Sequence, residues 1–330
     1  MAPPGIVPLL AGLLLAAPSS AFVPRPAATS PVSSTSASAP ASALGYSRLI
    51  CSFEEDDFGP RDEFPYTAKD LARLDQASDS RFYSEPRLVT HIDDGAIRSL
   101  TDYYAEELAE LADAKRRRGG GKGKGGEYYA VDVLDLCSSW ISHLPRNAGG
   151  FRLGRVAGLG MNAEELGQND QLTEYAVRDL NGSEMSSPAL AMAEYDDGSF
   201  DAVTCAVSVD YLTDPLGVFR EVHRVLRPGG RALFSFSDRC FPTKAVAIWL
   251  DADAIDRLTI VGSYFHHSSG GWASIDALDL KEEVSDAPPR PGLAEMFQNP
   301  AKGYAWAATA GAVAKARGGD PMYVVRAIKE

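Results

Sequence analysis

The chain has 330 residues, of which 45% are hydrophobic and 23% are charged, which is ordinary for a globular protein. Its net charge is −13, and residues 1–50 contain no acidic residue, so the acidic excess lies beyond residue 50. Such a body repels polyanions, and we expect no nucleic-acid partner. Four widely spaced cysteines without a Cys/His metal pattern argue against a disulfide framework and against a metal site.

The first fifty residues have the composition of targeting segments. Residues 6–17 form an apolar run that is too short to span a bilayer but suits a signal peptide, and residues 22–50 are rich in Ser, Ala and Pro. We expect a signal peptide over 1–21, a plastid transit peptide over 22–50, and no membrane span in the mature chain. The order resembles the two-part presequences of algae with complex plastids. Secretion with a disordered stalk is the alternative.

Residues 51–126 are expected to form an N-terminal extension. It begins with an acidic, turn-rich lead-in, and residues 67–113 are expected to be helical because apolar residues recur at helical spacing in Ala96–Leu111. The following stretch, Lys115–Gly126 (KRRRGGGKGKGG), is predicted to be a flexible linker, since its glycines favour neither helix nor strand.

One part of this extension is dense in polar and aromatic side chains. The segment 81–94 contains Tyr83, Arg87 and His91. These three side chains are predicted to belong to a lid over a binding site, where they would meet an acidic or aromatic acceptor. The alternative is the start of a surface helix capped by Asp93 or Asp94.

From residue 127 onward, short apolar runs alternate with helical patterns such as Ala163–Gly167 and Asp214–Leu226. The predicted strands are Tyr128–Leu136, Arg155–Leu159, Tyr175–Arg178, Phe200–Val209, Arg231–Ser237, Leu258–Phe265 and Met322–Ile328. This alternation predicts an α/β domain over 127–330 whose mostly parallel sheet is covered on both faces. Residues 282–320, with a short helix near Tyr304–Ala316, are expected to be an insertion before the last strand. Ligands of such sheets lie beyond the carboxyl ends of the strands.

The segment Gly198–Gly230 reads GSFDAVTCAVSVDYLTDPLGVFREVHRVLRPGG. It is similar to the fourth-strand, helix and fifth-strand block of class I S-adenosylmethionine (SAM)-dependent methyltransferases, especially the type 11 group. The resemblance implies SAM as cofactor and a Rossmann-like seven-stranded sheet of order 3-2-1-4-5-7-6. The strings DLCSSWISHLP, GMNAEEL, RDLN and SFSDRCF also resemble a little-characterised plant, algal and cyanobacterial methyltransferase-like group in which the glycine motif is altered.

The resemblance assigns cofactor contacts to residues that follow the first three strands: Asp135, Cys137, Ser138, Ser139, Asn162, Asp179 and Leu180. Cys137 and Ser139 stand where the broader family has glycines that let the backbone approach the methionine part of SAM. Gly160 stands where the family has an acid that grips the ribose, so Asn162 would offer one amide instead. Asp179 and Leu180 fall in the adenine-binding turn.

Methyl transfer needs a general base only if the acceptor must lose a proton. The candidate catalytic residues are Tyr211, which would act as an aromatic wall, Asp210 and His143; the alternatives are a turn residue for Asp210 and a surface residue for His143. The neighbouring histidines His266 and His267 are expected to lie in a loop rather than to bind a metal.

Three functions remain open on the sequence. The first is SAM-dependent methylation of a small-molecule or protein acceptor in the plastid. The second is a binding or regulatory module that keeps the fold without catalysis, and the altered glycines and Gly160 favour it. The third, an oxidoreductase, is disfavoured because the first turn lacks the GxGxxG pattern.

Overall fold

The computed structural model describes residues 23–24, 48–118, 129–146, 150–181, 188–281 and 319–330. The strands are β1 (Val23–Pro24), β2 (Arg48–Ser52), β3 (Tyr129–Leu136), β4 (Phe151–Gly160), β5 (Glu174–Val177), β6 (Phe200–Ala206), β7 (Leu226–Phe236), β8 (Trp272–Asp279) and β9 (Tyr323–Lys329). The α-helices are α1 (Asp79–Phe82), α2 (Asp94–Arg118), α3 (Ala163–Gln168), α4 (Pro188–Ala191), α5 (Pro215–Val225), α6 (Ala247–Asp251) and α7 (Ala254–Ser268). Two short 3₁₀ turns are η1 (Glu55–Asp57) and η2 (Val209–Tyr211).

All the strands join one sheet of order β1-β5-β4-β3-β6-β7-β9-β8-β2. Strands β3 to β7 are mutually parallel, and β9 runs antiparallel to both β7 and β8. Strands β3 to β9 therefore have the order 3-2-1-4-5-7-6 that the sequence predicts. The edge strand β2, antiparallel to β8, is an addition; it includes residues 48–50, which the sequence places in the transit peptide.

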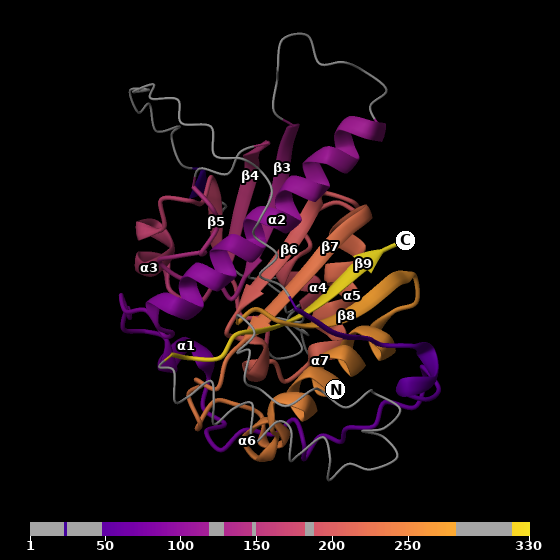
Figure 1. Ribbon diagram of the computed structural model, residues 1–330. Helices are drawn as coiled ribbons and strands as arrows, with labels where there is room; N and C mark the ends of the chain where they lie inside the picture. The colour runs from indigo at the N-terminus through magenta and orange to yellow at the C-terminus, as the bar shows by residue number, and fades with distance from the viewer. Residues whose placement is uncertain (1–22, 25–47, 119–128, 147–149, 182–187, 282–318) are drawn as a thin grey trace, which may run out of the picture.

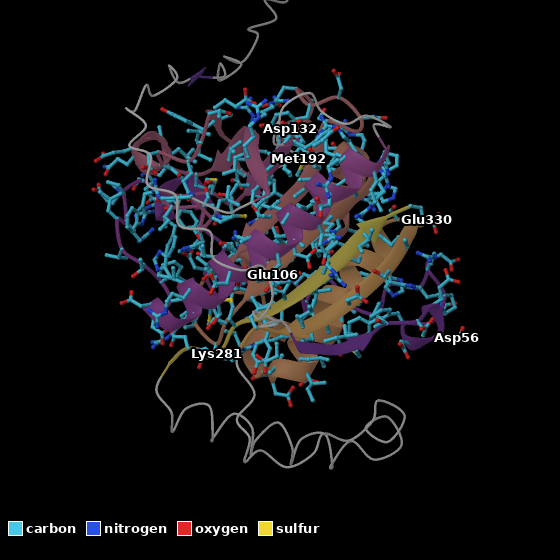
Figure 2. All side chains as sticks on the ribbon, turned by 45° about the horizontal axis from the view of Figure 1, so that its top comes forward. Asp56, Glu106, Asp132, Met192, Lys281 and Glu330 are labelled. Atoms are coloured by element: carbon cyan, nitrogen blue, oxygen red, sulfur yellow. The ribbon has the colours of Figure 1, made fainter. Side chains whose placement is uncertain are left out.

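Helices cover both faces of the sheet, so the domain has three layers (Figure 1). Helix α2 crosses one face, and its buried side chains, among them Leu100 and Leu108, pack against β3 and its neighbours. The position of α2 along the sheet is also visible beside Glu106 in Figure 2. Helices α5 and α7 pack together on the other face, where Phe219 meets Phe234 and Phe265. The two apolar cores hold the strand ends in place.

The predicted strand Leu258–Phe265 is wrong, because this stretch lies within helix α7. An apolar run with no polar alternation fits a buried helix as well as a strand. The helix is favoured here because Asp253 and Asp256 form a capping box at its start. The side chains on all sides of its later turns are buried. The true sixth strand is β8, which lies further along the chain.

The expected helix over 67–113 is also only partly correct. Residues 67–93 are mostly irregular and contain only the short α1, whereas α2 extends the helical part to Arg118, into the predicted linker. Asp93 caps α2 by accepting from the Ala96 N–H at 2.8 Å. Most of the predicted insertion 282–320 and its helix lie outside the described residues, as do residues 1–22 and 25–47.

The ends of two predicted strands shift as well. Strand β6 stops at Ala206 rather than continuing to Val209, because the backbone turns sharply at Val207 (φ 43°) and enters η2. The Arg227–Gly230 turn does not precede β7 but bulges within it, with Gly229 in the left-handed region (φ 76°). The first change lies next to the cavity, whereas the second lies at the amino end of β7, on the opposite edge of the sheet.

Candidate active site

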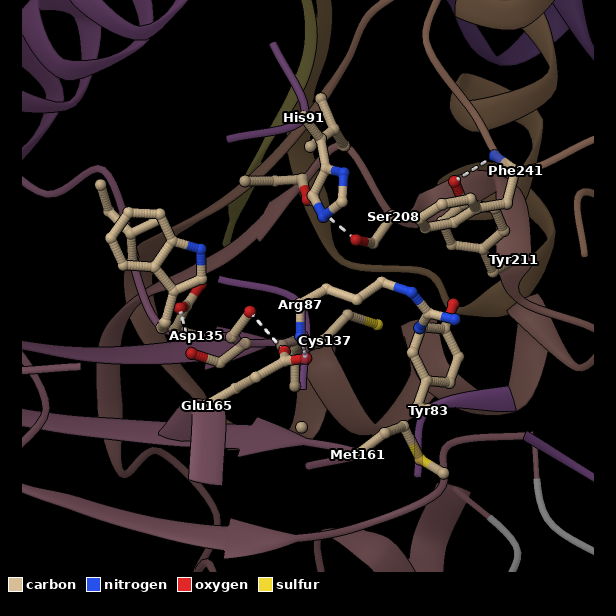
Figure 3. Close-up of a pocket in the computed structure, with 18 of the residues that line it drawn as sticks. Tyr83, Arg87, His91, Asp135, Cys137, Met161, Glu165, Ser208, Tyr211 and Phe241 are labelled. Atoms are coloured by element: carbon tan, nitrogen blue, oxygen red, sulfur yellow. Dashed lines mark hydrogen bonds between the residues drawn. The ribbon is translucent and has the colours of Figure 1, made fainter. Parts of the chain in front are cut away.

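A cavity of about 280 Å³ lies beyond the carboxyl ends of the parallel strands. Its walls come from the segments that follow β3, β4, β5, β6 and β7, and from residues 79–93, which we call the strap. Side chains from these distant segments converge on the same space (Figure 3). The position is where an open α/β sheet binds ligands, at the switch in strand order between β3 and β6.

The floor of the cavity is organised around the carboxylate of Asp135, at the end of β3. This buried side chain accepts hydrogen bonds from Ser138 Oγ at 2.6 Å, Ser142 Oγ at 2.7 Å and Thr204 Oγ1 at 2.9 Å. Burial raises its pKa to about 6, although the three hydroxyls oppose that rise. The sequence places Asp135 at the cofactor, and the structure shows that its oxygens first fix the turn that follows β3.

Among the described residues, three non-glycine residues have backbones in the left-handed region, and all three line the cavity: Cys137 (φ 53°), His143 (φ 55°) and Val207 (φ 43°). This conformation costs an L-residue roughly 1–2 kcal/mol. Backbone strain of this kind is kept where the surroundings impose it, and it is common at functional sites. Cys137 therefore makes the turn that glycine would make in the broader family, at a conformational cost.

The glycine at the end of β4 is explained by the same turn. A Cβ atom at Gly160 would lie 2.0 Å from the carbonyl oxygen of Ser138, so no side chain fits there. The Ser138 N–H in turn donates to the Leu159 carbonyl at 2.7 Å, which holds the turn over the strand end. The serine-rich turn and the missing acid are thus one structural change, because the turn occupies the space an acid would need.

A carboxylate that the sequence analysis missed reaches the cavity from helix α3. Glu165 accepts from Ser139 Oγ at 2.5 Å and from the Arg87 N–H at 2.7 Å, and it lines the cavity (Figure 3). Its position three residues after the N-cap Asn162 is typical of a capping box, which hides any other role in the sequence. Glu165 instead joins the turn after β3 to the strap.

The other cofactor candidates divide into two groups. Asp179 and Leu180, after β5, line the cavity, as do Cys137, Ser138 and Ser139. Burial raises the pKa of Asp179, whose Oδ1 accepts from the Asn181 N–H. Asn162 does not line the cavity in the way the sequence implies: its Oδ1 caps α3, and its amide nitrogen donates to the Tyr83 carbonyl at 2.9 Å. The amide expected to replace the ribose-binding acid is therefore already engaged.

The strap is fastened by a buried charged network. Asp79, at its start, accepts from Arg73 at 2.8 Å and from Asn181 Nδ2 at 3.0 Å, and lies 3.1 Å from Lys244 Nζ. The Lys244 side chain is fully buried and also donates to the Ala77 carbonyl. Asn181 continues the network to the Tyr211 carbonyl, so the strap is tied to the loops after β5, β6 and β7.

The three predicted lid residues, Tyr83, Arg87 and His91, all line the cavity. They belong to an irregular strap, not to a helix, and Asp93 separately caps α2 as the alternative reading expects. Trp140 lines the cavity too, and its indole N–H donates to the Val89 carbonyl of the strap at 3.1 Å. The indole is fixed to the strap while the cavity beside it stays open.

The three predicted catalytic residues differ in whether they line the cavity. Tyr211 lines the cavity, and its hydroxyl accepts from the Phe241 N–H at 2.8 Å (Figure 3). His143 also lines it and is buried rather than on the surface; burial lowers its pKa to about 4. Asp210 is buried but does not line the cavity, and burial raises its pKa to about 8, so at neutral pH it is protonated and unsuited to act as a base.

His266 and His267 lie in helix α7, not in the expected loop. Their ring nitrogens contact the carbonyl oxygens of Gly59 at 2.9 Å and Arg61 at 3.0 Å, respectively. Among the described residues, no group of three His, Cys, Asp or Glu side chains is arranged to hold a metal ion. Within that same part of the chain, no helix has both the length and the apolar character needed to cross a membrane.

Part of the chain is similar to a known protein family. Residues 148–234, which run from the end of the first crossover to the middle of β7, match the family model described as a methyltransferase domain. Together with the sheet order, this match shows that residues 148–234 are similar to a methyltransferase domain.

Curated proteins are similar to part of the chain as well. A ubiquinone biosynthesis O-methyltransferase of Albidiferax ferrireducens is 29% identical over 158 residues, which cover 43% of this chain and 62% of the relative. A demethylmenaquinone methyltransferase of Lactococcus lactis is 32% identical over 186 residues, which cover 52% of this chain and 66% of the relative. The chain thus spans less than two thirds of either relative.

Solved structures are more distant. The phosphoethanolamine N-methyltransferase 2 of Haemonchus contortus in complex with SAM has a TM-score of 0.38 and 15% identity, with 77% of this chain and 60% of the other covered. At these values the likeness carries no argument about activity.

Proposed function

We propose that this protein transfers the methyl group of SAM to a small-molecule acceptor. The observation that carries the proposal is the cavity over the ends of β3 to β6, with the carboxylates of Asp179 and Glu165 at its border and a turn of small residues between them. A cavity of about 280 Å³ approaches the lower end of the range, about 300–1,000 Å³, that small-molecule sites occupy.

The residues present fit SAM. Asp179 and Leu180 would hold the adenine, and the turn Cys137–Ser139 would hold the methionine part. Glu165 would take over the ribose contact, because two of its roughly four acceptor positions are used and Gly160 offers no side chain. When bound, SAM supplies a methyl group already activated by a sulfonium.

The chain itself supplies positioning and exclusion of water. The strap closes the cavity opposite the strand ends, and Tyr211 holds a fixed wall through its bond to Phe241. Burial lowers the pKa of His91, so its imidazole is neutral at neutral pH and is available in the cavity to accept a proton from the acceptor. His143, buried beside it, is neutral for the same reason.

The size of the cavity favours a small acceptor over a protein side chain. Both curated relatives are named for quinone biosynthesis, and this supports a flat ring compound as the acceptor. The alternative is a domain that binds SAM without methyl transfer, and the strained Cys137 in place of glycine is the observation that favours it.

We also propose that the protein acts in the plastid of an alga with a complex plastid. The apolar run 6–17 followed by the acid-free, Ser/Ala/Pro-rich stretch 22–47 supports this location. A fusion of residues 1–50 to a fluorescent protein, expressed in such an alga, should accumulate in the plastid. Fluorescence in the medium or the secretory pathway would contradict the proposal.

Two measurements test the activity. Calorimetric titration of S-adenosylhomocysteine (SAH) should show binding, and Asp179→Ala should weaken it roughly ten- to hundredfold, as expected for loss of a charged hydrogen bond. Incubation of the protein with methyl-labelled SAM and a plastid extract should then label a small molecule. Absence of SAM and SAH binding at millimolar concentration rejects the proposal, whereas binding without label transfer supports the non-catalytic alternative.

A further inference from the structure

The side chain of Arg87 crosses the cavity and ends among aromatic rings. Its guanidinium carbon lies 4.4 Å from the centroid of Phe82, 5.4 Å from that of Phe241 and 5.6 Å from that of Tyr83. In Figure 3 the chain extends from the Glu165 side toward Tyr83 and Tyr211. Rings at these distances stabilise the cation and fix the plane of the guanidinium.

The hydrogen bonds of Arg87 are incomplete. Nη2 donates to the Phe82 carbonyl at 2.9 Å, but Nη1 is buried and finds no partner among the described residues. A buried donor without an acceptor costs about 1–3 kcal/mol, and more when the group is charged. Such a donor at the wall of a cavity indicates that a ligand supplies the acceptor.

The charge of Arg87 is also unbalanced. Three arginines line the cavity: Arg178 pairs with Glu194 at 2.8 Å, and Arg239 pairs with Asp320 at 2.8 Å. Arg87 forms no ion pair within the described part of the chain; the nearby Glu165 carboxylate accepts from its backbone N–H instead. In a chain with net charge −13, an unpaired and partly buried arginine in the cavity is conspicuous.

The position of the guanidinium assigns the missing anion to the acceptor. Its aromatic neighbour Phe241 follows β7, and Tyr211, which bonds to Phe241, follows β6. The proposed cofactor contacts lie after β3, β4 and β5. The guanidinium therefore reaches a ring on the β7 side of the cavity, while Phe82 and Tyr83 of the strap flank it.

We infer that the acceptor is an aromatic carboxylic acid whose carboxylate is bound by Nη1 of Arg87. The rings of Tyr83, Tyr211 and Phe241 suit a flat apolar body, and a carboxylate accepts in the plane of the guanidinium. This inference rests on the proposed function, since it names the substrate class of the same site.

The test uses the full mature chain saturated with SAH and two probes that differ in charge, 3,4-dihydroxybenzoate and 3,4-dihydroxybenzamide. Calorimetry should show that the acid binds at least tenfold more tightly than the amide. Arg87→Gln should reduce this preference to less than threefold while changing SAH affinity less than threefold. Arg146→Gln, which removes an equal charge from an exposed ion pair outside the cavity, should keep the preference.

Three results would overturn the inference while leaving the proposed function intact. They are equal affinity of the acid and the amide, no binding of either probe to the SAH complex, and an Arg87→Gln variant that loses SAH affinity but keeps the preference. The last would assign the anion to the cofactor. A protein that does not bind SAH at all would instead remove the proposed function, and this inference with it.

Discussion

The floor and the strap of the cavity satisfy their polar groups in different ways. On the floor, the carboxylate of Asp135 is saturated by three hydroxyls, and the turn above it is fixed without a ligand. The strap is fixed at its base by the pair of Asp79 and Lys244, but further along it Arg87 keeps an unpartnered donor. The floor is therefore preorganised, whereas the strap needs a ligand to satisfy the free donor of Arg87.

The largest effect is expected where the strap is fastened. Lys244→Ala removes one of the two cations that pair with the buried Asp79 and leaves Arg73 as the other, so the loss should be at most the roughly 3–5 kcal/mol that breaking a buried ion pair costs. Urea denaturation should show this loss in the free energy of unfolding, and limited proteolysis should show earlier cleavage within the strap. Lys69→Ala, at an exposed position, serves as the control and should change stability by less than about 0.5 kcal/mol. Equal behaviour of the two variants would mean that the network does not hold the strap.

The second largest effect is expected at Gly160, which lies beneath the turn that follows β3. Gly160→Ala places a methyl group 2.0 Å from the Ser138 carbonyl oxygen, and the resulting shift should destabilise the fold by about 2–3 kcal/mol and weaken SAH binding. Gly167→Ala is the matched control, because its Cβ would meet only the Tyr175 hydroxyl at 3.5 Å. Thermal unfolding and SAH titration of both variants check this. A tolerated Gly160→Ala would show that the turn is free to move.

The third prediction concerns Asp210, which is buried but does not line the cavity. Burial raises the pKa of Asp210 from 3.8 to about 8, so between these values the folded chain keeps a proton that the unfolded chain releases. Stability contributed by this proton is present at low pH and is lost as the pH rises through the window.

Between pH 6.5 and 8, the wild-type free energy of unfolding should fall by about 1.5 kcal/mol relative to that of Asp210→Asn, because the other titrating groups, His143 and Asp135 among them, are common to both proteins. An unchanged slope in the variant would show that Asp210 is ionised at neutral pH, and its exclusion as a base would then have to be withdrawn.

The smallest effect is expected from the backbone strain at Cys137, in the floor of the cavity. Cys137 has φ 53°, so Cys137→Gly should be more stable than Cys137→Ala by about 1 kcal/mol, because both lose the thiol but only glycine adopts this backbone freely. Chemical denaturation of the two variants measures the difference. Equal stabilities would indicate that the turn is not strained.

Much of the sheet follows from the sequence because local pattern and burial agree there. The strand order of β3 to β9 is implied by the resemblance to class I methyltransferases, which rests on the FD strand, the amphipathic helix α5 and the RPGG turn. The prediction fails at Leu258–Phe265, where a helix covered on all sides has no polar stripe to mark its period. It also fails in the strap, whose conformation depends on the distant Lys244 rather than on its own periodicity.

The residues of the site, like the strands, are predicted only in part from the sequence. Residues directly after strands, such as Asp179 and Tyr211, reach the cavity because parallel strands end at one edge. Glu165 was missed because its spacing from Asn162 is that of a helix cap. Asp210 was misplaced because one residue along a 3₁₀ turn separates a side chain that faces the cavity from one that faces the core.

We expect the floor to receive SAM although a serine-rich turn replaces both the glycine turn and the strand-end acid. A crystal structure of the complex with SAH would show this. We expect the adenosine between Asp179 and the turn Cys137–Ser139, with a ribose hydroxyl within hydrogen-bond distance of Glu165. SAH bound elsewhere, or a ribose that contacts neither Glu165 nor the turn after β3, would contradict it.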